Sequence, residues 1–173
     1  GFMELRASNE YWIYIRNGRA KKVYKDFKGA IDEYGKAIKI CPNLCNAYFY
    51  RANINFFLKN YDYAIKDYSE ALRKNNLSVC ETFILQKRGI CYLIKEKHRE
   101  AIEDLTKALN MERKPILYLM RGYSYAKQNR FDLALIDIGK SIELEPDILK
   151  NNKNILEDLP GFYKGIIKNN ILK

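Results

Sequence analysis

The sequence predicts an all-α fold made of helix pairs that follow one another along the chain. An eight-residue block occurs four times, with an alanine at its fourth position in each copy. These alanines lie 34, 37 and 33 residues apart, a period that fits two helices and two turns. With 47% apolar residues and only four prolines in 173 residues, the chain has the composition of a folded protein. The four alanines are Ala30, Ala64, Ala101 and Ala134.

Two further small residues accompany each alanine, one 12 positions upstream and one seven positions downstream. Small residues on one stripe of a helix allow a neighbouring helix to approach closely. We therefore expect the upstream helix of each repeat to pack tightly on its downstream helix. The upstream residues are Gly18, Ala52, Gly89 and Gly122, and the downstream residues are Ala37, Ala71, Ala108 and Ser141.

Prolines and a change of spacing mark the boundaries of the repeats. Pro42 and Pro146 are expected to end the second helices of the first and last repeats, and Pro115 fits the first turn of a helix. Three extra residues lengthen the junction near residues 75–79. The predicted repeats are 11–44, 45–81, 82–114 and 115–146. Residues 1–10 are expected to hold a cloning remnant, Gly1-Phe2, and the start of the first helix.

Apolar residues continue at helical spacing beyond the last repeat. They predict a helix over residues 147–159 that covers the exposed apolar face of that repeat. Pro160-Gly161 breaks this helix, and residues 160–173 form an apolar tail. The tail is either a second cap or a segment that docks elsewhere, so homo-oligomer formation through it stays open. The helical stripe consists of Ile148, Leu149, Ile155, Leu156 and Leu159.

These features resemble the tetratricopeptide repeat, whose pattern has small residues at positions 8, 20 and 27, tyrosine at 11, an aromatic residue at 24 and proline at 32. The resemblance covers about residues 11–146, with Tyr34 and Tyr68 as aromatic residues. Lys21 and Asn55 depart from the pattern where it has tyrosine. The resemblance implies a right-handed superhelical solenoid of helix-turn-helix repeats with a C-terminal capping helix. It also implies a concave groove lined by the first helices.

The resemblance selects six positions of each first helix that face this groove, named here the first-helix stripe. Five of its 24 residues are lysine or arginine, none is acidic, and aromatic residues lie between them. This composition favours a peptide that carries apolar anchors and negative charge. The stripe consists of Trp12, Ile15, Arg16, Arg19, Lys22, Val23, Asn46, Phe49, Tyr50, Asn53, Phe56, Phe57, Phe83, Gln86, Lys87, Ile90, Leu93, Ile94, Ile116, Leu119, Met120, Tyr123, Ala126 and Lys127. The candidate binding residues among them are Arg16, Arg19, Lys22, Phe49, Tyr50, Asn53, Phe56, Phe83, Lys87, Tyr123 and Lys127.

By analogy with the family, we expect an adaptor or scaffold domain that holds a segment of another protein. One alternative is a co-chaperone that binds the C-terminal tail of a heat-shock chaperone through a carboxylate clamp. The clamp positions implied by the resemblance hold Ile15, Arg19, Tyr50, Phe83 and Lys87, and only Lys87 keeps the expected charge. The clamp is therefore not matched.

Single-stranded RNA binding is the other alternative, because basic residues bind phosphates and aromatic residues stack on bases. Strong phosphate binding requires a contiguous row of lysine and arginine. Here Lys22, Lys87 and Lys127 are spread over three repeats and separated by apolar side chains. The spacing thus argues against nucleic acid as the partner.

The sequence gives no support for catalysis, metal binding or membrane insertion. The single histidine, His98, is not accompanied by an acid–base or nucleophile pattern. The four cysteines lack zinc-site spacing, so we expect reduced thiols, no cofactor and no enzyme activity. The apolar runs fall short of the roughly 18 to 20 residues that cross a bilayer, and we expect a cytoplasmic protein. The net charge of +10 fits an acidic partner without identifying it.

Overall fold

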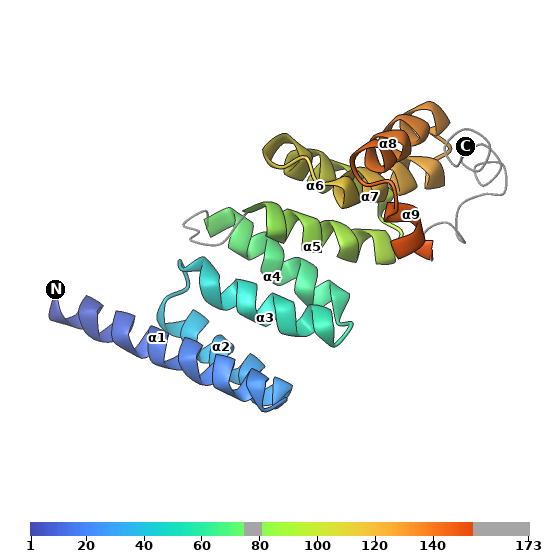
Figure 1. The fold of residues 1–173 in the computed structure, drawn as a ribbon. Helices are drawn as coiled ribbons and strands as arrows, with labels where there is room; N and C mark the ends of the chain where they lie inside the picture. Colours follow the sequence, from blue (N-terminus) through green and yellow to red (C-terminus); the bar gives the residue numbers. More distant parts are fainter. Residues whose placement is uncertain (75–80, 154–173) are drawn as a thin grey trace. The chain divides into compact units, whose positions relative to one another are not determined.

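The computed structural model describes residues 1–74 and 81–153, and every regular element in these ranges is a helix (Figure 1). The chain forms two compact units, residues 1–84 and residues 85–173, with the boundary inside α5. The predicted all-α fold of successive helix pairs is confirmed. The helices are α1 (Phe2–Val23), α2 (Phe27–Ile40), α3 (Cys45–Phe57), α4 (Tyr61–Lys74), α5 (Glu81–Ile94), α6 (His98–Met111), α7 (Pro115–Lys127), α8 (Phe131–Leu144) and α9 (Ile148–Asn151).

A residue in the left-handed conformation connects the two helices of every pair. In the first pair this residue is Lys25, with φ of 61°. The next residue, Asp26, donates its backbone N–H to the carbonyl of Lys21 at 2.9 Å, as in a Schellman motif. The motif satisfies carbonyls at the end of the first helix and reverses the chain for the second. The equivalent residues of the other pairs are Lys59, Glu96 and Asn129, with φ of 61°, 56° and 58°.

The small residues bring the two helices of a pair into close contact, as expected. A Cβ atom added to Gly18 of α1 would lie 2.5 Å from the Tyr34 ring of α2. A Cβ atom at Gly122 of α7 would lie 2.9 Å from the Ile138 side chain of α8. These distances are too short for a methyl group, so both positions require glycine while the helices stay at this separation.

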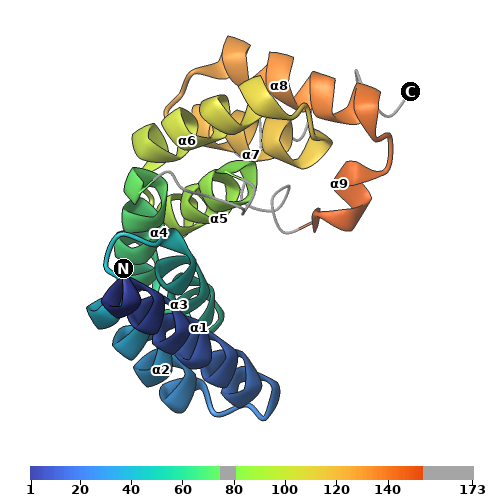
Figure 2. The same ribbon diagram turned by 90° about the vertical axis from the view of Figure 1, so that its left-hand side faces the viewer.

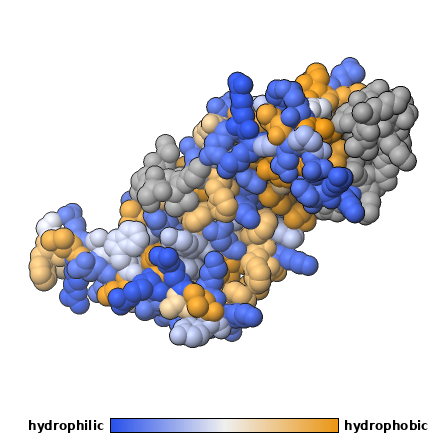
Figure 3. All heavy atoms as spheres, viewed as in Figure 1, coloured by the Kyte–Doolittle hydropathy of each residue, from blue (hydrophilic) through white to orange (hydrophobic). Residues whose placement is uncertain are grey.

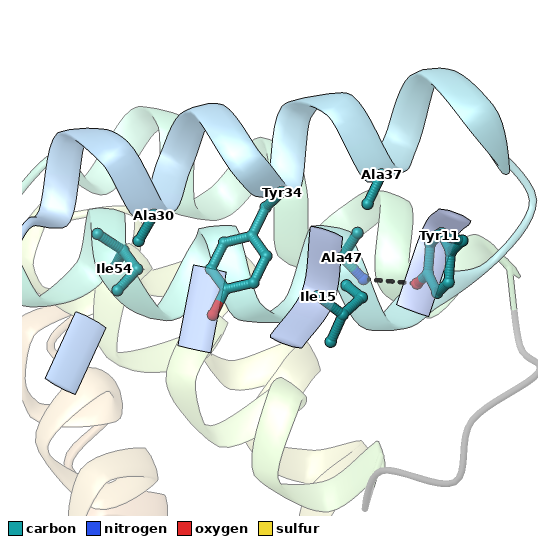
Figure 4. Close-up of a cluster of buried hydrophobic side chains, with 7 residues drawn as sticks. All are labelled: Tyr11, Ile15, Ala30, Tyr34, Ala37, Ala47 and Ile54. Atoms are coloured by element: carbon teal, nitrogen blue, oxygen red, sulfur yellow. Dashed lines mark hydrogen bonds between the residues drawn. The ribbon is translucent and has the colours of Figure 1, made fainter. Parts of the chain in front are cut away.

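Two buried tyrosines organise the core of the N-terminal unit (Figure 4). The Tyr11 hydroxyl on α1 accepts a hydrogen bond of 3.1 Å from the backbone N–H of Ala47 on α3. This bond connects the first repeat to the second. Burial raises the pKa of Tyr11 to about 12, so its hydroxyl stays neutral at physiological pH. The cluster comprises Tyr11, Ile15, Ala30, Tyr34, Ala37, Ala47 and Ile54.

The core of the C-terminal unit contains residues from α7, α8 and α9. Leu119 of α7 and Ile138 of α8 are fully buried together with Ile148 of α9, which follows α8 through a short turn (Figure 2). Pro115 begins α7 at its first position, as expected, and α8 ends at Leu144, shortly before Pro146. The remainder of the predicted capping helix after residue 153 and the predicted tail lie outside the described residues.

The first helix begins nine residues before the first predicted repeat. Its exposed N-terminal end carries Phe2, Met3 and Leu5, and Figure 3 shows apolar atoms there. This end contributes little to the core, because the first buried side chain of α1 is that of Tyr11.

A substitution at Gly139 tests how helix propensity alone affects stability, because an added Cβ atom there would contact no other residue. Gly139 lies inside α8, and a Cβ atom there would have no atom within 4 Å. Glycine in a helix interior costs about 0.5 to 1 kcal/mol relative to alanine, so we expect Gly139→Ala to stabilise the protein by that amount. Urea unfolding measures the change. Gly122→Ala, at the crowded position on α7, should have the opposite sign, and equal effects would contradict the packing.

Candidate functional site

The stripe residues of α1 form a basic, solvent-exposed surface on the N-terminal unit. Arg16, Arg19 and Lys22 lie three residues apart on one face of the helix, and all three are exposed. Trp12 precedes them on the same face and is 49% exposed. Ile15, the remaining stripe residue between Trp12 and Arg16, is buried in the core.

A row of aromatic rings from α2, α3 and α5 lies in the same unit. The Tyr34 ring stacks on Tyr50 with centroids 5.6 Å apart, Tyr50 contacts Phe49 at 5.4 Å, and Phe49 contacts Phe83 at 5.9 Å. Burial raises the pKa of Tyr34 to about 12, while the charge of Arg19 acts in the opposite direction. The Tyr34 ring packs against Gly18, the residue that precedes Arg19 on α1. The row consists of Tyr34, Tyr50, Phe49 and Phe83.

The exposure of these rings differs along the row. Phe49 is 8% exposed and Phe83 is 39% exposed, whereas Tyr50 is half-buried. Phe49 accordingly acts mainly in packing, and Tyr50 and Phe83 offer more surface to a ligand. Phe56 is half-buried and contacts Tyr61 with ring centroids 5.9 Å apart.

Asn53 is held in a defined orientation beside this row. Its Oδ1 atom accepts a hydrogen bond of 2.7 Å from the hydroxyl of Tyr68. The amide nitrogen of Asn53 forms no hydrogen bond within residues 1–74 and 81–153. Because an amide presents two N–H donors when its oxygen is engaged, Asn53 can donate to a carbonyl or carboxylate of a ligand.

The stripe residues of the C-terminal unit include a contact between a cation and an aromatic ring. Lys127 is exposed, and its Nζ lies 5.3 Å from the centre of the Tyr123 ring. Lys87 is half-buried on α5. Leu119 and Ala126 are buried, so these two stripe residues belong to the core.

The candidate residues therefore fall into two sets, one in each unit. In the N-terminal unit, the structure brings Phe49, Tyr50 and Phe83 into one aromatic row, and Arg16, Arg19 and Lys22 lie on one helix face. In the C-terminal unit, it brings Tyr123 and Lys127 into contact.

A repeated arginine–aspartate pair connects the two helices of each of the last three repeats, and sequence reasoning missed it. Arg88 of α5, for example, donates to both carboxylate oxygens of Asp104 of α6 at 2.7 Å. The arginine recurs 13 residues before each repeat alanine and the aspartate three residues after it, a signal present in the sequence. The other pairs are Arg51 with Asp67 and Arg121 with Asp137.

The first repeat replaces this pair with lysine contacts. Asn17 stands at the arginine position, and buried Glu33 at the aspartate position accepts hydrogen bonds from Lys36 and Lys21 at 3.1 and 3.3 Å. Burial acts to raise the pKa of Glu33, but the hydrogen bonds from Lys36 and Lys21 outweigh it and lower the pKa. Glu33 therefore remains ionised at neutral pH.

The single histidine packs between the last two repeats. His98 begins α6 and contacts the Tyr123 ring at a centroid distance of 6.2 Å. Its Nδ1 atom is buried without a hydrogen-bond partner in the described part of the chain. Burial lowers the pKa of His98, the charge of Lys127 adds to this effect, and Glu96 opposes it.

We expect this packing to make stability depend on pH through His98. Because the pKa of the folded state lies below the unfolded value of 6.5, the unfolded chain binds the proton more readily. Stability is therefore fully present above that value and decreases as the pH falls through it. Urea unfolding between about pH 5.5 and 7.5, above the range where carboxylates titrate, measures the loss. His98→Phe, which keeps an aromatic ring, should remove this dependence, and an unchanged dependence would contradict it.

The two buried thiols, those of Cys45 and Cys91, are not poised for chemistry. Burial raises the pKa of Cys91 to about 12 and also raises that of Cys45, so both stay protonated at neutral pH.

Within residues 1–74 and 81–153, no three histidine, cysteine or acidic side chains gather closely enough to bind a metal ion. Over the same ranges, no helix combines the length and apolar composition of a membrane-crossing segment.

Comparison with known proteins identifies the repeat. The family model described as tetratricopeptide repeat matches residues 84–115 and 116–148. No curated protein sequence matches the chain.

Solved structures of similar fold include YrrB, described as a tetratricopeptide repeat protein with an unusual peptide-binding site. It is 19% identical with a TM-score of 0.70, over 77% of this chain and 68% of that chain. A crystal structure of MamA is 20% identical with a TM-score of 0.70, over 81% of each chain. MamA from Desulfovibrio magneticus is 12% identical with a TM-score of 0.75, over 84% of this chain and 81% of that chain. Residues 84–148 thus contain two tetratricopeptide repeats, and the chain shares its fold with YrrB and MamA.

Proposed function

We propose that the chain is an adaptor or scaffold that binds a segment of another protein along its first-helix stripe. The observation that carries the proposal is that the N-terminal unit holds both an exposed basic face on α1 and the aromatic row on α2, α3 and α5. Tetratricopeptide repeats in general bind proteins or peptides, and YrrB is described as having a peptide-binding site. Both points support a peptide as the ligand.

The chemistry of this surface favours an extended segment with acidic and apolar side chains. Arg16, Arg19 and Lys22 would attract carboxylates, and the exposed parts of Tyr50 and Phe83 would accept apolar anchors. Asn53 would fix the backbone by donating from its amide nitrogen. Tyr123 and Lys127 supply groups of the same kind on the C-terminal unit.

A titration of fluorescein-labelled peptides measured by anisotropy tests this proposal. The probe is a peptide with alternating leucine or phenylalanine and glutamate, and a peptide with lysine in place of glutamate is the control. We expect Arg16→Glu/Arg19→Glu to weaken binding about tenfold, because two exposed charges each contribute up to about 1 kcal/mol. The matched control is Lys28→Glu/Lys107→Glu, which reverses two exposed lysines on α2 and α6.

The apolar contribution needs its own variants and a salt series. Phe83→Ala should weaken binding, whereas Tyr24→Ala, at a highly exposed tyrosine outside the stripe, should not. Peptide binding anchored by apolar contacts persists at near-physiological salt. Tight binding of a single-stranded uridine oligonucleotide that falls steeply with salt would instead favour RNA. Equal losses in the stripe and control variants would overturn the proposal.

A further inference from the structure

A charged cleft lies between α2 and α4 of the N-terminal unit and shares no residue with the first-helix stripe. It consists of two pockets of about 340 and 390 Å³, both lined by Ile31 and Arg51. Five cationic and three acidic side chains line it. Two of the acidic residues, Glu33 and Asp67, are buried in ion pairs, so the accessible walls are predominantly basic. The cations are Lys21, Lys36, Lys39, Arg51 and Lys66.

Among the described residues, the Nη1 nitrogen of the Arg51 guanidinium is left without a partner at this cleft. Its Nε and Nη2 atoms donate to Asp67 at 2.7 and 2.8 Å. Its Nη1 atom has no hydrogen-bond partner among residues 1–74 and 81–153. A Cβ atom added to Gly35, which is also in the cleft wall, would lie 3.7 Å from Nη1.

In the C-terminal unit, the equivalent arginine has a hydrogen-bond acceptor for its Nη1 atom. Arg121 makes the same two bonds to Asp137, and its Nη1 atom also donates to the hydroxyl oxygen of Thr106 at 3.1 Å. Thr106 lies five residues after its repeat alanine, as Gly35 does in the first repeat. Gly35 thus removes the acceptor oxygen and opens the space that it would fill. The Arg51 side chain is correspondingly more exposed, at 27% against 18% for Arg121.

We propose that this cleft binds an oxyanion, with one of its oxygens accepting from Arg51 Nη1 where Thr106 accepts from Arg121. An anionic oxygen makes a shorter and stronger hydrogen bond to a guanidinium than a hydroxyl does. Exposed Lys39 and Lys66 add positive charge on the two walls. The ligand is a phosphate or carboxylate group carried by a partner molecule. The site is independent of the peptide surface proposed above, because the two have no residue in common.

Inorganic phosphate and acetate are the two probes, and they distinguish a phosphate group from a carboxylate group as the ligand. Each is titrated against the ¹⁵N-labelled chain while the backbone amide signals of Gly35, Lys36 and Lys39 are followed, with sodium chloride at equal ionic strength as reference. We expect saturable shifts with phosphate and not with chloride. Saturation with acetate as well would assign the site to carboxylates in addition to phosphates.

Gly35→Thr is the decisive variant, because it supplies the hydroxyl that the third repeat already has. It should weaken phosphate binding at least about tenfold while leaving binding to the stripe unchanged. Gly139→Thr makes the same substitution at the equivalent position of the last repeat and should leave phosphate binding unchanged. Lys39→Gln, which changes an exposed side chain, should weaken binding to a smaller extent. No saturable shift with either anion, or equal affinity in Gly35→Thr and the unmodified chain, would overturn the proposal.

Discussion

Asp137→Ala is expected to destabilise the protein by about 3 kcal/mol, because it leaves a partly buried guanidinium without its counter-ion. Asp137 is almost completely buried and accepts two hydrogen bonds from Arg121. The Arg121 side chain is 18% exposed, and the rings of Tyr118 and Tyr125 lie within 6.0 Å of it. Water can therefore replace the lost carboxylate only in part. Because the Arg121 side chain keeps some exposure to solvent, the expected loss of stability lies at the lower end of the range for buried ion pairs.

Urea unfolding of two further variants distinguishes this effect from a general loss of charge. Glu143→Ala removes an exposed carboxylate that pairs with Lys140 on the same helix, and its cost should stay below about 0.5 kcal/mol. Arg121→Met/Asp137→Leu replaces both partners by apolar groups and should recover most of the loss. If Asp137→Ala costs no more than Glu143→Ala, the pair does not stabilise the repeat.

The recurrence of one unit made the fold predictable from sequence. Its small residues and its period of 33 to 37 residues predicted the helix pairs. In the structure, Gly18 and Gly122 lie where the two helices of a pair come into close contact. Glycine at these positions is a direct consequence of the space available, so the residue type indicates the packing. The same reasoning placed Pro115 at the start of a helix, because its fixed φ and missing N–H suit that position.

The turns and ion pairs were harder to predict, for two different reasons. Lys25, Lys59 and Glu96 adopt a left-handed conformation that residue type does not indicate, because the helix packing on both sides determines the turn. The arginine–aspartate pairs depend on side chains 16 residues apart, which become neighbours only when two helices are packed. Their regular recurrence is visible in the sequence, but charged residues are common enough that recurrence alone did not suggest pairing.

Within the candidate site, sequence position predicted which helix face a residue occupies better than how exposed it is. Arg16 and Arg19 are exposed, as a binding role requires, whereas Phe49 is largely covered. Phe49 lies on the first-helix stripe like the two arginines, but the rings of Phe83 and Tyr50 contact it and cover it. Contacts of this type depend on side chains from two helices, so a stripe read from one helix at a time does not show them.

Tyr34→Ala is expected to have the other large effect, a loss of about 4 kcal/mol in the free energy of unfolding. The ring is 1% exposed and packs directly against Gly18, which has no side chain to move into the space left behind. The cavity would persist, and the stacking contact with Tyr50 would be lost. We therefore expect weaker binding of the acidic-apolar peptide as well, because Tyr50 loses the ring that supports it.

Tyr34→Phe separates the ring from its hydroxyl in the same unfolding experiment. The Tyr34 hydroxyl has no hydrogen-bond partner in the described ranges, so this change should cost less than about 1 kcal/mol. Tyr24→Ala, at a tyrosine that is 84% exposed, should be nearly neutral for both stability and peptide binding. A loss in Tyr34→Phe as large as that in Tyr34→Ala would show that the hydroxyl, and not the buried ring, stabilises the N-terminal unit. Normal peptide affinity in folded Tyr34→Ala would show that Tyr50 binds without support from the ring beneath it.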